Sequence, residues 1–243
     1  MSPLSVRSLL LVPLTSLVVF LLIDHAPSRL PVHIDGHVDD GFESVRDVFR
    51  QNFVEGWERG GAALVVIKDG KTVVDLWGGY ADPDAHRRWK DDTVQVTFST
   101  TKGVAAVCLA VLVDRGHLSY DDLVTKYWPE FGKHGKDNVT VEMLLTHQAG
   151  LAYLDEDVTE EEAADPQAIS RRLEDQRPLW SPGRASGYHI YTFGWLADQL
   201  VRRVDPAGRS IGRFVKEELH DAFNVDFYIG LPDNVMGRHC KIK

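Results

Sequence analysis

The stretch "FSTTKGVAAVCLAVLVDRGHL", residues 98–118, places a serine three positions before a lysine and then continues as an apolar run that stops at a glycine. The pattern predicts a buried helix over residues 99–114, with Gly116 as its C-terminal signal. Residues three apart lie on one face of a helix, so the side chains of Ser99 and Lys102 are expected to meet at its N-terminus. Two interpretations are open: Ser99 is an ordinary helix N-cap, or it is a nucleophile whose base, Lys102, lies one turn away.

The catalytic interpretation depends on the environment of these two side chains. A serine hydroxyl attacks poorly unless a neighbouring base takes its proton, and a lysine acts as that base only when it is neutral. Burial lowers the pKa of a lysine, and the positive end of a helix also disfavours the ammonium form. The apolar run after Lys102 would supply a dry setting, and the backbone N–H of Ser99 would supply half of an oxyanion hole. Acyl transfer is the chemistry that this arrangement predicts.

The composition argues against several other classes of protein. The 243 residues are 44% hydrophobic and 26% charged, as in an ordinary globular protein, and the formal net charge is −9. No basic stripe is present, so we expect no nucleic-acid partner. Neither an H-E-x-x-H motif nor a C-x-x-C pair occurs, so we expect no metal and no cofactor. Cys108 is interpreted as a buried free thiol, and a bridge between Cys108 and Cys240 is left open.

The N-terminus has a different character from the rest of the chain. Residues 9–23 are uncharged and strongly apolar, a length between the core of a signal peptide and a full membrane span. We therefore interpret residues 1–24 as a signal anchor or a signal peptide, and residues 25–40 as a linker. A glycosylation sequon at Asn138 fits a lumenal or extracellular domain. The expected location is membrane-anchored through a single N-terminal span, or secreted.

Residues 41–243 are expected to form one domain of the α+β class. Apolar residues at helical spacing predict a helix over residues 42–57, and Asp69–Gly70 predicts a tight β-hairpin within residues 62–80. Thr140 is a candidate N-cap for a short helix that ends before Gly150. Two further amphipathic helices are predicted over residues 192–204 and 211–223. A hairpin followed by many helices indicates separate rather than alternating strands and helices.

Three segments in order resemble the serine β-lactamase-related hydrolases: residues 98–131, then "TVEMLLTHQAGLAY", then "WSPGRASGYHIYTFGWLADQLV". This family comprises class C β-lactamases, DD-peptidases, family VIII-type esterases and animal β-lactamase-like proteins. The resemblance implies the β-lactamase/transpeptidase-like fold, in which Ser99 is acylated and Lys102 helps to deprotonate it. The "LLTHQAGL" segment resembles a structural signature of the family, so His147 is interpreted as a packing or loop-fixing residue rather than a general base.

The second catalytic element of the family is Y-x-N, whose tyrosine passes protons between nucleophile and leaving group. The resemblance carries that role to Tyr188, because "PGRASG" precedes it in the expected setting. The asparagine position holds Ile190, so an amide that would orient the substrate is missing. A neighbouring ammonium would lower the pKa of the Tyr188 phenol. A surface tyrosine without a catalytic role is the alternative, and Tyr191 is a weaker substitute.

The third element of the family, K-T-G or H-x-G, is absent after Tyr188. The remaining strands of the family's central sheet should follow this point, whereas the chain ends at "GRHCKIK". We therefore expect the N-terminal part of a longer hydrolase, with a helical subdomain and an incomplete antiparallel sheet. The leading prediction is a serine hydrolase that acts on small-molecule or peptide esters or amides through an acyl-enzyme. The alternative is a catalytically inactive, membrane-tethered scaffold or pseudoenzyme remnant.

A second serine lies in a misleading motif. Residues 208–212, "GRSIG", match the G-x-S-x-G nucleophile elbow of α/β-hydrolases. That elbow requires a strand before the serine, but a helical pattern interrupted by Pro206 precedes it. Ser210 is therefore predicted to be the N-cap of the next helix rather than a nucleophile.

Overall fold

The computed structural model describes residues 30–241, which divide into two units. Unit 1 contains the residues up to Gln95 together with those from Arg238 onward, and unit 2 is Val96–Gly237. The predicted signal segment, residues 1–24, lies outside the described residues.

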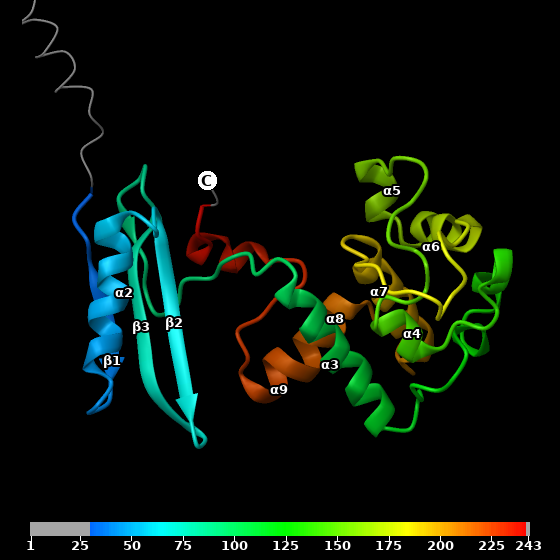
Figure 1. Ribbon diagram of the computed structural model, residues 1–243, viewed down its shortest axis with the longest axis horizontal. Coiled ribbons are helices and arrows are strands. Elements are labelled where there is room, and N and C mark those ends of the chain that lie inside the picture. Colours follow the sequence, from blue (N-terminus) through cyan, green and yellow to red (C-terminus); the bar gives the residue numbers. More distant parts are fainter. Residues whose placement is uncertain (1–29, 242–243) are drawn as a thin grey trace, which may run out of the picture. The chain divides into compact units, whose positions relative to one another are not determined.

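Unit 1 is built on an antiparallel sheet with the strand order β1-β3-β2 and with β4 paired to β3 (Figure 1). The β2–β3 connection confirms the predicted hairpin: Asp69 and Gly70 have φ of 52° and 74°, which are the left-handed values that such a two-residue turn requires. The elements of unit 1 are β1 Ile34–Val38, α2 Glu43–Glu55, β2 Gly61–Lys68, β3 Lys71–Asp82 and β4 Arg87–Arg88.

Strand β1 lies inside the segment that the sequence indicates as a linker. Its sequence, IDGHV, contains Asp, Gly and His, which are poor strand formers, so local preference gives little sign of it. The strand exists because it pairs with the long strand β3, from Ile34 opposite Gly78 to Val38 opposite Val74. At Gly36 a Cβ would lie 2.1 Å from the carbonyl oxygen of Asp75, so only glycine permits this close approach.

Helix α2 covers the sheet with the apolar face that its sequence predicts. Phe49 and Phe53 are buried, with ring centroids 5.4 Å apart in an edge-on arrangement, and they share a core with the buried Val74 and Leu76. Trp57 differs from the expectation: the helix ends at Glu55, and the indole is exposed in the loop that follows.

Unit 2 is helical and centred on α3, which is Thr100–Asp114 and so confirms the predicted buried helix. The helix ends where the sequence indicates, because Gly116 has φ 74° and its N–H bonds to the carbonyl of Val113. Helix α3 packs against α7 and α8, and its buried residues include Leu109 and Leu112 (Figure 1). The other helices are α4 Val141–Leu145, α5 Glu160–Ala164, α6 Pro166–Asp175, α7 Thr192–Val204, α8 Ile211–Val215 and α9 Asp221–Phe223, with a π-helical segment at Lys216–His220 and 3₁₀ turns at Val124–Lys126, Pro129–Gly135 and Asp233–Arg238.

A buried polar cluster supports the loops of unit 2. The side chain of Lys136 is fully buried and donates hydrogen bonds to the carbonyl oxygens of Glu174 and Gln176, at 2.9 and 2.6 Å. The Glu174 carboxylate in turn accepts from the Trp128 indole and the Ser170 hydroxyl. Burial lowers the pKa of Lys136 to about 8. These hydrogen bonds hold the C-terminal end of α6 in place. No apolar pattern in the sequence indicates them.

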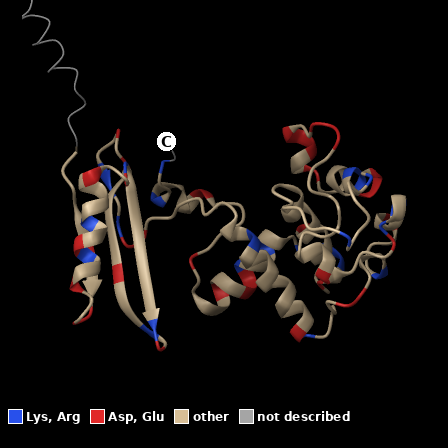
Figure 2. Ribbon diagram, viewed as in Figure 1, with Lys and Arg blue, Asp and Glu red and all other residues tan. Residues whose placement is uncertain are grey.

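Charged residues pair locally on the surface of unit 2. Acidic residues gather on α5, α6 carries both basic and acidic residues, and Arg172 joins the two helices through Glu162 at 3.0 Å (Figure 2). Such partly exposed pairs contribute little stability individually.

The expectation of a membrane-anchored location requires correction. No helix within residues 30–241 combines the length and the apolar character needed to cross a bilayer. The segment on which the expectation rested, residues 1–24, lies outside the described residues. Cys108 is a buried free thiol, as predicted, and burial raises its pKa to about 11.

Candidate active site

The first turn of α3 brings Ser99 and Lys102 together. The Lys102 side-chain nitrogen Nζ lies 3.1 Å from Ser99 Oγ, within hydrogen-bonding distance. Ser99 occupies the N-cap position, but its backbone is already helical at φ −71° and ψ −9°, and its hydroxyl makes no capping bond. The hydroxyl therefore faces the lysine instead of satisfying the helix backbone. Phe98, immediately before it, has φ 45°, a left-handed conformation that is uncommon for a bulky residue.

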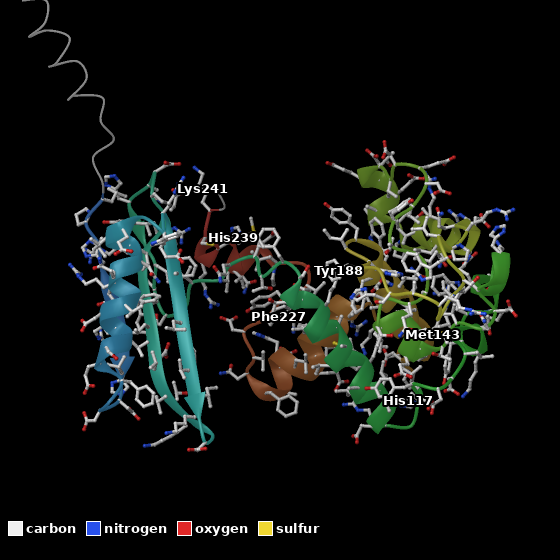
Figure 3. The ribbon with its side chains drawn as sticks, viewed as in Figure 1. His117, Met143, Tyr188, Phe227, His239 and Lys241 are labelled. Carbon is white, nitrogen blue, oxygen red and sulfur yellow. The ribbon has the colours of Figure 1, made fainter. Side chains whose placement is uncertain are left out.

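The third predicted residue reaches the same place from a distant loop. Tyr188 lies in the segment before α7, and the Lys102 nitrogen lies 4.9 Å from the centroid of its ring (Figure 3). The same nitrogen donates to the carbonyl oxygen of Ile190 at 2.8 Å, which ties the loop to α3. The structure thus brings together all three side chains that the sequence singles out.

The electrostatics of the cluster favour ionisation of the phenol. A side-chain hydrogen bond with Ser99, and then the hydrogen bond and positive charge of Lys102, hold the pKa of Tyr188 below its usual value. The cluster is more open than expected, because Ser99 and Tyr188 are exposed and Lys102 is only half-buried. The dry setting predicted from the apolar run applies to the body of α3 and not to its first turn.

The imidazole ring of His147 packs against the ring of Tyr188. Its ring centroid lies 4.8 Å from that of Tyr188 and 5.1 Å from that of Phe193, and its Nδ1 accepts the backbone N–H of His189 at 3.1 Å. Burial, followed by the positive charge of Lys102, lowers the pKa of His147. These contacts confirm the predicted packing role of His147.

His189 is a supporting residue that the sequence analysis missed. It is fully buried, and its Nε2 accepts the backbone N–H of Leu151 at 2.9 Å while its Nδ1–H donates to the Gly187 carbonyl. Burial lowers the pKa of His189, which favours this neutral form. The imidazole therefore joins the "LLTHQAGL" loop to the loop that carries Tyr188. A histidine beside a tyrosine gives no signal of such a role in the sequence.

A pocket of about 540 Å³ opens beside Lys102, entirely within unit 2. Ile190, which stands where the family motif has asparagine, contributes its side chain to the pocket and its carbonyl oxygen to Lys102. Tyr191, the weaker substitute for Tyr188, is the N-cap residue of α7 and also lines the pocket. The full lining is Phe98, Thr101, Lys102, Ala105, Ile190, Tyr191, Phe193, Gly194, Trp195, Asp198, Ser210, Ile211, Gly212, Ile229 and Gly230.

Ser210 behaves as predicted for a helix cap. Its backbone is extended, and its Oγ accepts the N–H of Arg213 at 3.2 Å at the start of α8. The element directly before it is helix α7 rather than a strand, so the G-x-S-x-G match lacks the context of a nucleophile elbow.

Comparison with known proteins identifies the family. The family model "Beta-lactamase" matches residues 49–239. The chain belongs to the Beta-lactamase family. Esterase/beta-lactamase LipL of Mycobacterium tuberculosis is 37% identical over 198 residues, which cover 81% of this chain and 45% of that protein. Esterase EstB of Burkholderia gladioli is 37% identical over 97 residues, covering 38% of this chain and 25% of that protein.

Two solved structures share this fold. A family VIII carboxylesterase superposes with a TM-score of 0.82 at 40% identity, covering 87% of this chain and 57% of that one. A penicillin-binding protein homologue from Caulobacter crescentus gives a TM-score of 0.81 at 43% identity, covering 87% of this chain and 56% of that one. The predicted β-lactamase/transpeptidase-like fold is therefore confirmed. The chain spans about half the length of these relatives.

Proposed function

We propose that this protein is a serine hydrolase that cleaves ester bonds through an acyl-enzyme, with Ser99 as nucleophile, Lys102 as its base and Tyr188 as the proton relay. The observation that carries the proposal is the position of one nitrogen, Lys102 Nζ, which lies 3.1 Å from Ser99 Oγ and 4.9 Å from the Tyr188 ring centroid. Membership of a family whose relatives include proteins named as esterases supports the choice of esters.

The proposed reaction begins with attack of Ser99 Oγ on the ester carbonyl, while its proton passes to the neutral amine form of Lys102 or, where Lys102 is charged, to the Tyr188 phenolate. A bond forms between Oγ and the carbonyl carbon, and the resulting oxyanion needs hydrogen-bond donors. The backbone N–H of Ser99 makes no hydrogen bond to the described residues, so it is available as one such donor. Collapse of the intermediate breaks the bond to the alcohol, whose oxygen takes a proton from Tyr188.

Water completes the cycle in the proposed second half. It attacks the acyl-enzyme with help from the same base, releases the carboxylic acid and returns the proton to Ser99. The lowered pKa of Tyr188 makes its phenolate more accessible than that of an ordinary tyrosine, which suits a group that must both accept and donate a proton.

A fluorophosphonate probe tests the nucleophile directly, because it forms a covalent bond only with an activated serine. We expect stoichiometric labelling of the protein, retained in Ser210→Ala and lost in Ser99→Ala. The two serines make a matched pair, since both occupy N-cap positions. Circular dichroism establishes that each variant is folded.

One observation favours a second candidate function, a non-catalytic remnant of the fold. Ile190 replaces the amide that would orient a substrate, so the chain departs from the family motif. A well-folded sample that the probe does not label would support this candidate and overturn the hydrolase proposal.

A further inference from the structure

The turn that carries Tyr188, residues 188–191, is attached differently from the loop before it. The last residue of that loop, Gly187, donates its N–H to the carbonyl oxygen of His147 at 3.1 Å, an ordinary backbone bond. Among the described residues, no N–H of residues 188–191 donates to a backbone carbonyl. The N–H of His189 donates instead to a side chain, the Nδ1 atom of His147, at 3.1 Å. The position of the turn therefore depends on side-chain acceptors.

The two imidazoles accept backbone N–H groups through opposite ring nitrogens. The Nδ1 atom of His147 is an acceptor, so the proton of this neutral ring lies on Nε2. The Nε2 atom of His189 accepts the N–H of Leu151 at 2.9 Å and its Nδ1 faces the carbonyl oxygen of Gly187, so its proton lies on Nδ1. An imidazolium donates from both nitrogens and accepts at neither. A proton on either ring would therefore replace an N–H···N bond by a contact between two donors.

The surroundings of the two rings disfavour a positive charge. The titratable groups that face them are Lys102 from α3, the phenol of Tyr188 and the rings themselves. Their other ring neighbours, Trp180 and Phe193, cannot ionise as acids or bases near neutral pH. Within residues 30–241 no carboxylate pairs with either imidazole, so nothing offsets an added charge. Burial is the largest cause that lowers the pKa of each ring.

We propose that His147 and His189 form a proton-sensitive latch that positions Tyr188: two neutral rings hold the turn beside Lys102, and a proton taken from solvent by either ring releases it. Both histidines are positioning residues, because each acts through the turn and not on the reacting atoms. The effect of the latch on catalysis rests on the proposed function, whereas the latch itself can be observed without any reaction.

Two substitutions keep the acceptors and remove the titration. An asparagine at position 147 places its amide oxygen near the Nδ1 position, and it tolerates the left-handed backbone of His147, which has φ 63°. A glutamine at position 189 places its amide oxygen near the Nε2 position, where it can accept the N–H of Leu151. His147→Phe does the opposite, because it keeps a ring against Tyr188 but removes the acceptor.

Nitrogen-15 NMR of the full chain tests the latch without turnover. At about pH 8 we expect a protonated Nδ1 on His189 and a protonated Nε2 on His147, each assigned by the loss of its signals in His189→Gln or His147→Asn. As pH falls below the ordinary histidine value of 6.5, the amide signals of Leu151 and His189 should shift together with the ring nitrogens. Other tautomers, or amides that stay in place while the rings titrate, overturn the latch.

The substituted proteins sharpen this measurement. In His147→Asn/His189→Gln the acid shift of the Leu151 and residue-189 amides should be lost. In His147→Phe the residue-189 amide should show its low-pH position already at neutral pH. His117→Gln is the matched control, because it removes an exposed histidine beyond the end of α3 and should leave the acid shift in place. An acid shift that persists in the double variant would contradict the proposal.

The pH dependence of kcat/KM for 4-nitrophenyl acetate tests the catalytic consequence. Ionisation of Lys102 and Tyr188 affects every variant alike, so the slopes on the acid side are compared between variants. Release by one proton should make the wild-type rate fall about tenfold more per pH unit than the rate of His147→Asn/His189→Gln. His117→Gln should keep the wild-type slope. Equal slopes in the wild type and the double variant overturn the catalytic consequence. If no ester is hydrolysed, the proposed function fails, and the NMR measurements still decide whether the latch exists.

Discussion

Helices α3 and α8 begin with the same pattern, a serine followed three residues later by a basic residue, yet the two serines do different things. At α8 the Ser210 backbone is extended, with ψ 157°, and its hydroxyl accepts the N–H of Arg213, whose guanidinium bonds to Glu217 at 2.6 Å. At α3 the Ser99 backbone is helical, with ψ −9°, and the hydroxyl contacts the side chain of Lys102 instead.

The difference lies in the backbone before the helix and in the partner of the basic residue. A capping hydroxyl reaches back to the helix only from an extended residue, and the left-handed turn at Phe98 delivers Ser99 in another conformation. Within residues 30–241 no carboxylate forms an ion pair with Lys102, whereas Arg213 is paired with Glu217. A serine that is released from capping and meets a lysine without an acidic partner is available for chemistry.

The largest expected effect is a loss of activity on substitution of Lys102, for which Arg213 is the control. Lys102→Met removes the proposed base but keeps the apolar stem, so we expect kcat/KM for 4-nitrophenyl esters to fall by about 10²–10⁴. Arg213→Met removes only a surface ion pair and should leave kcat/KM within a factor of two. Steady-state kinetics on folded samples measures both, and equal effects would show that the α3 pattern is no more catalytic than the α8 pattern.

Two tyrosines beside lysines extend the comparison. Tyr188 contacts Ser99 and Lys102, whereas Tyr127, whose ring centroid lies 5.1 Å from Lys126 Nζ, donates its hydroxyl to Asp122. Tyr188→Phe should lower the single-turnover acylation rate by about a hundredfold, because the proton relay is lost. Tyr127→Phe is the control, and a similar loss in that variant would remove Tyr188 from the proposed mechanism.

The two tyrosines should ionise at different pH values in an alkaline titration. The hydrogen bond with Ser99 and the interactions with Lys102 lower the pKa of Tyr188, whereas burial and the hydrogen bond to Asp122 raise the pKa of Tyr127. The component of the tyrosinate absorbance that is lost in Tyr188→Phe should therefore lie at lower pH than the component lost in Tyr127→Phe. The reverse order would contradict the assigned environments.

Those pKa directions also fix the sign of the effect on stability. The contribution of Tyr188 to the free energy of unfolding rises as pH increases from its folded-state pKa toward 10, the unfolded value, because the folded state then binds fewer protons. The contribution of Tyr127 is present below pH 10 and is lost as pH rises through its higher folded-state pKa.

The smallest expected effect is a change in the free energy of unfolding when the N-cap serines are substituted. Ser210→Ala removes a capping bond and should lower the free energy of unfolding by about 1 kcal/mol. Ser99→Ala removes no capping bond, so its effect on unfolding should be smaller. Urea denaturation compares the two variants, and a larger loss in Ser99→Ala would contradict the assigned backbone roles.

Features set by local chemistry could be predicted from the sequence. Asp69–Gly70 specifies its turn, Thr140 caps α4 through the N–H of Met143, and the apolar run predicts the buried α3. The resemblance to a known family singled out Tyr188, and the structure places its ring beside Lys102. Their catalytic roles remain proposals.

Features that depend on distant partners could not be predicted in the same way. Strand β1 forms because β3 offers it an edge, and His189 acquires its role only when residue 151 lies against it. The buried Lys136 looks like a surface lysine in the sequence, since its acceptors are backbone carbonyl oxygens at the distant C-terminal end of α6. The bond from Lys102 to the Ile190 carbonyl involves a backbone atom, which no side-chain pattern reveals.

The turn at Phe98 has a consequence for engineering this protein. A bulky residue at φ 45° is a local cost of about 1 kcal/mol or more, which a glycine would relieve. Phe98→Gly is therefore an attractive substitution for thermal tolerance, but it would also remove an aromatic wall from the pocket and loosen the approach to Ser99. A substitution at this position that raises heat resistance is therefore expected to lower catalytic activity.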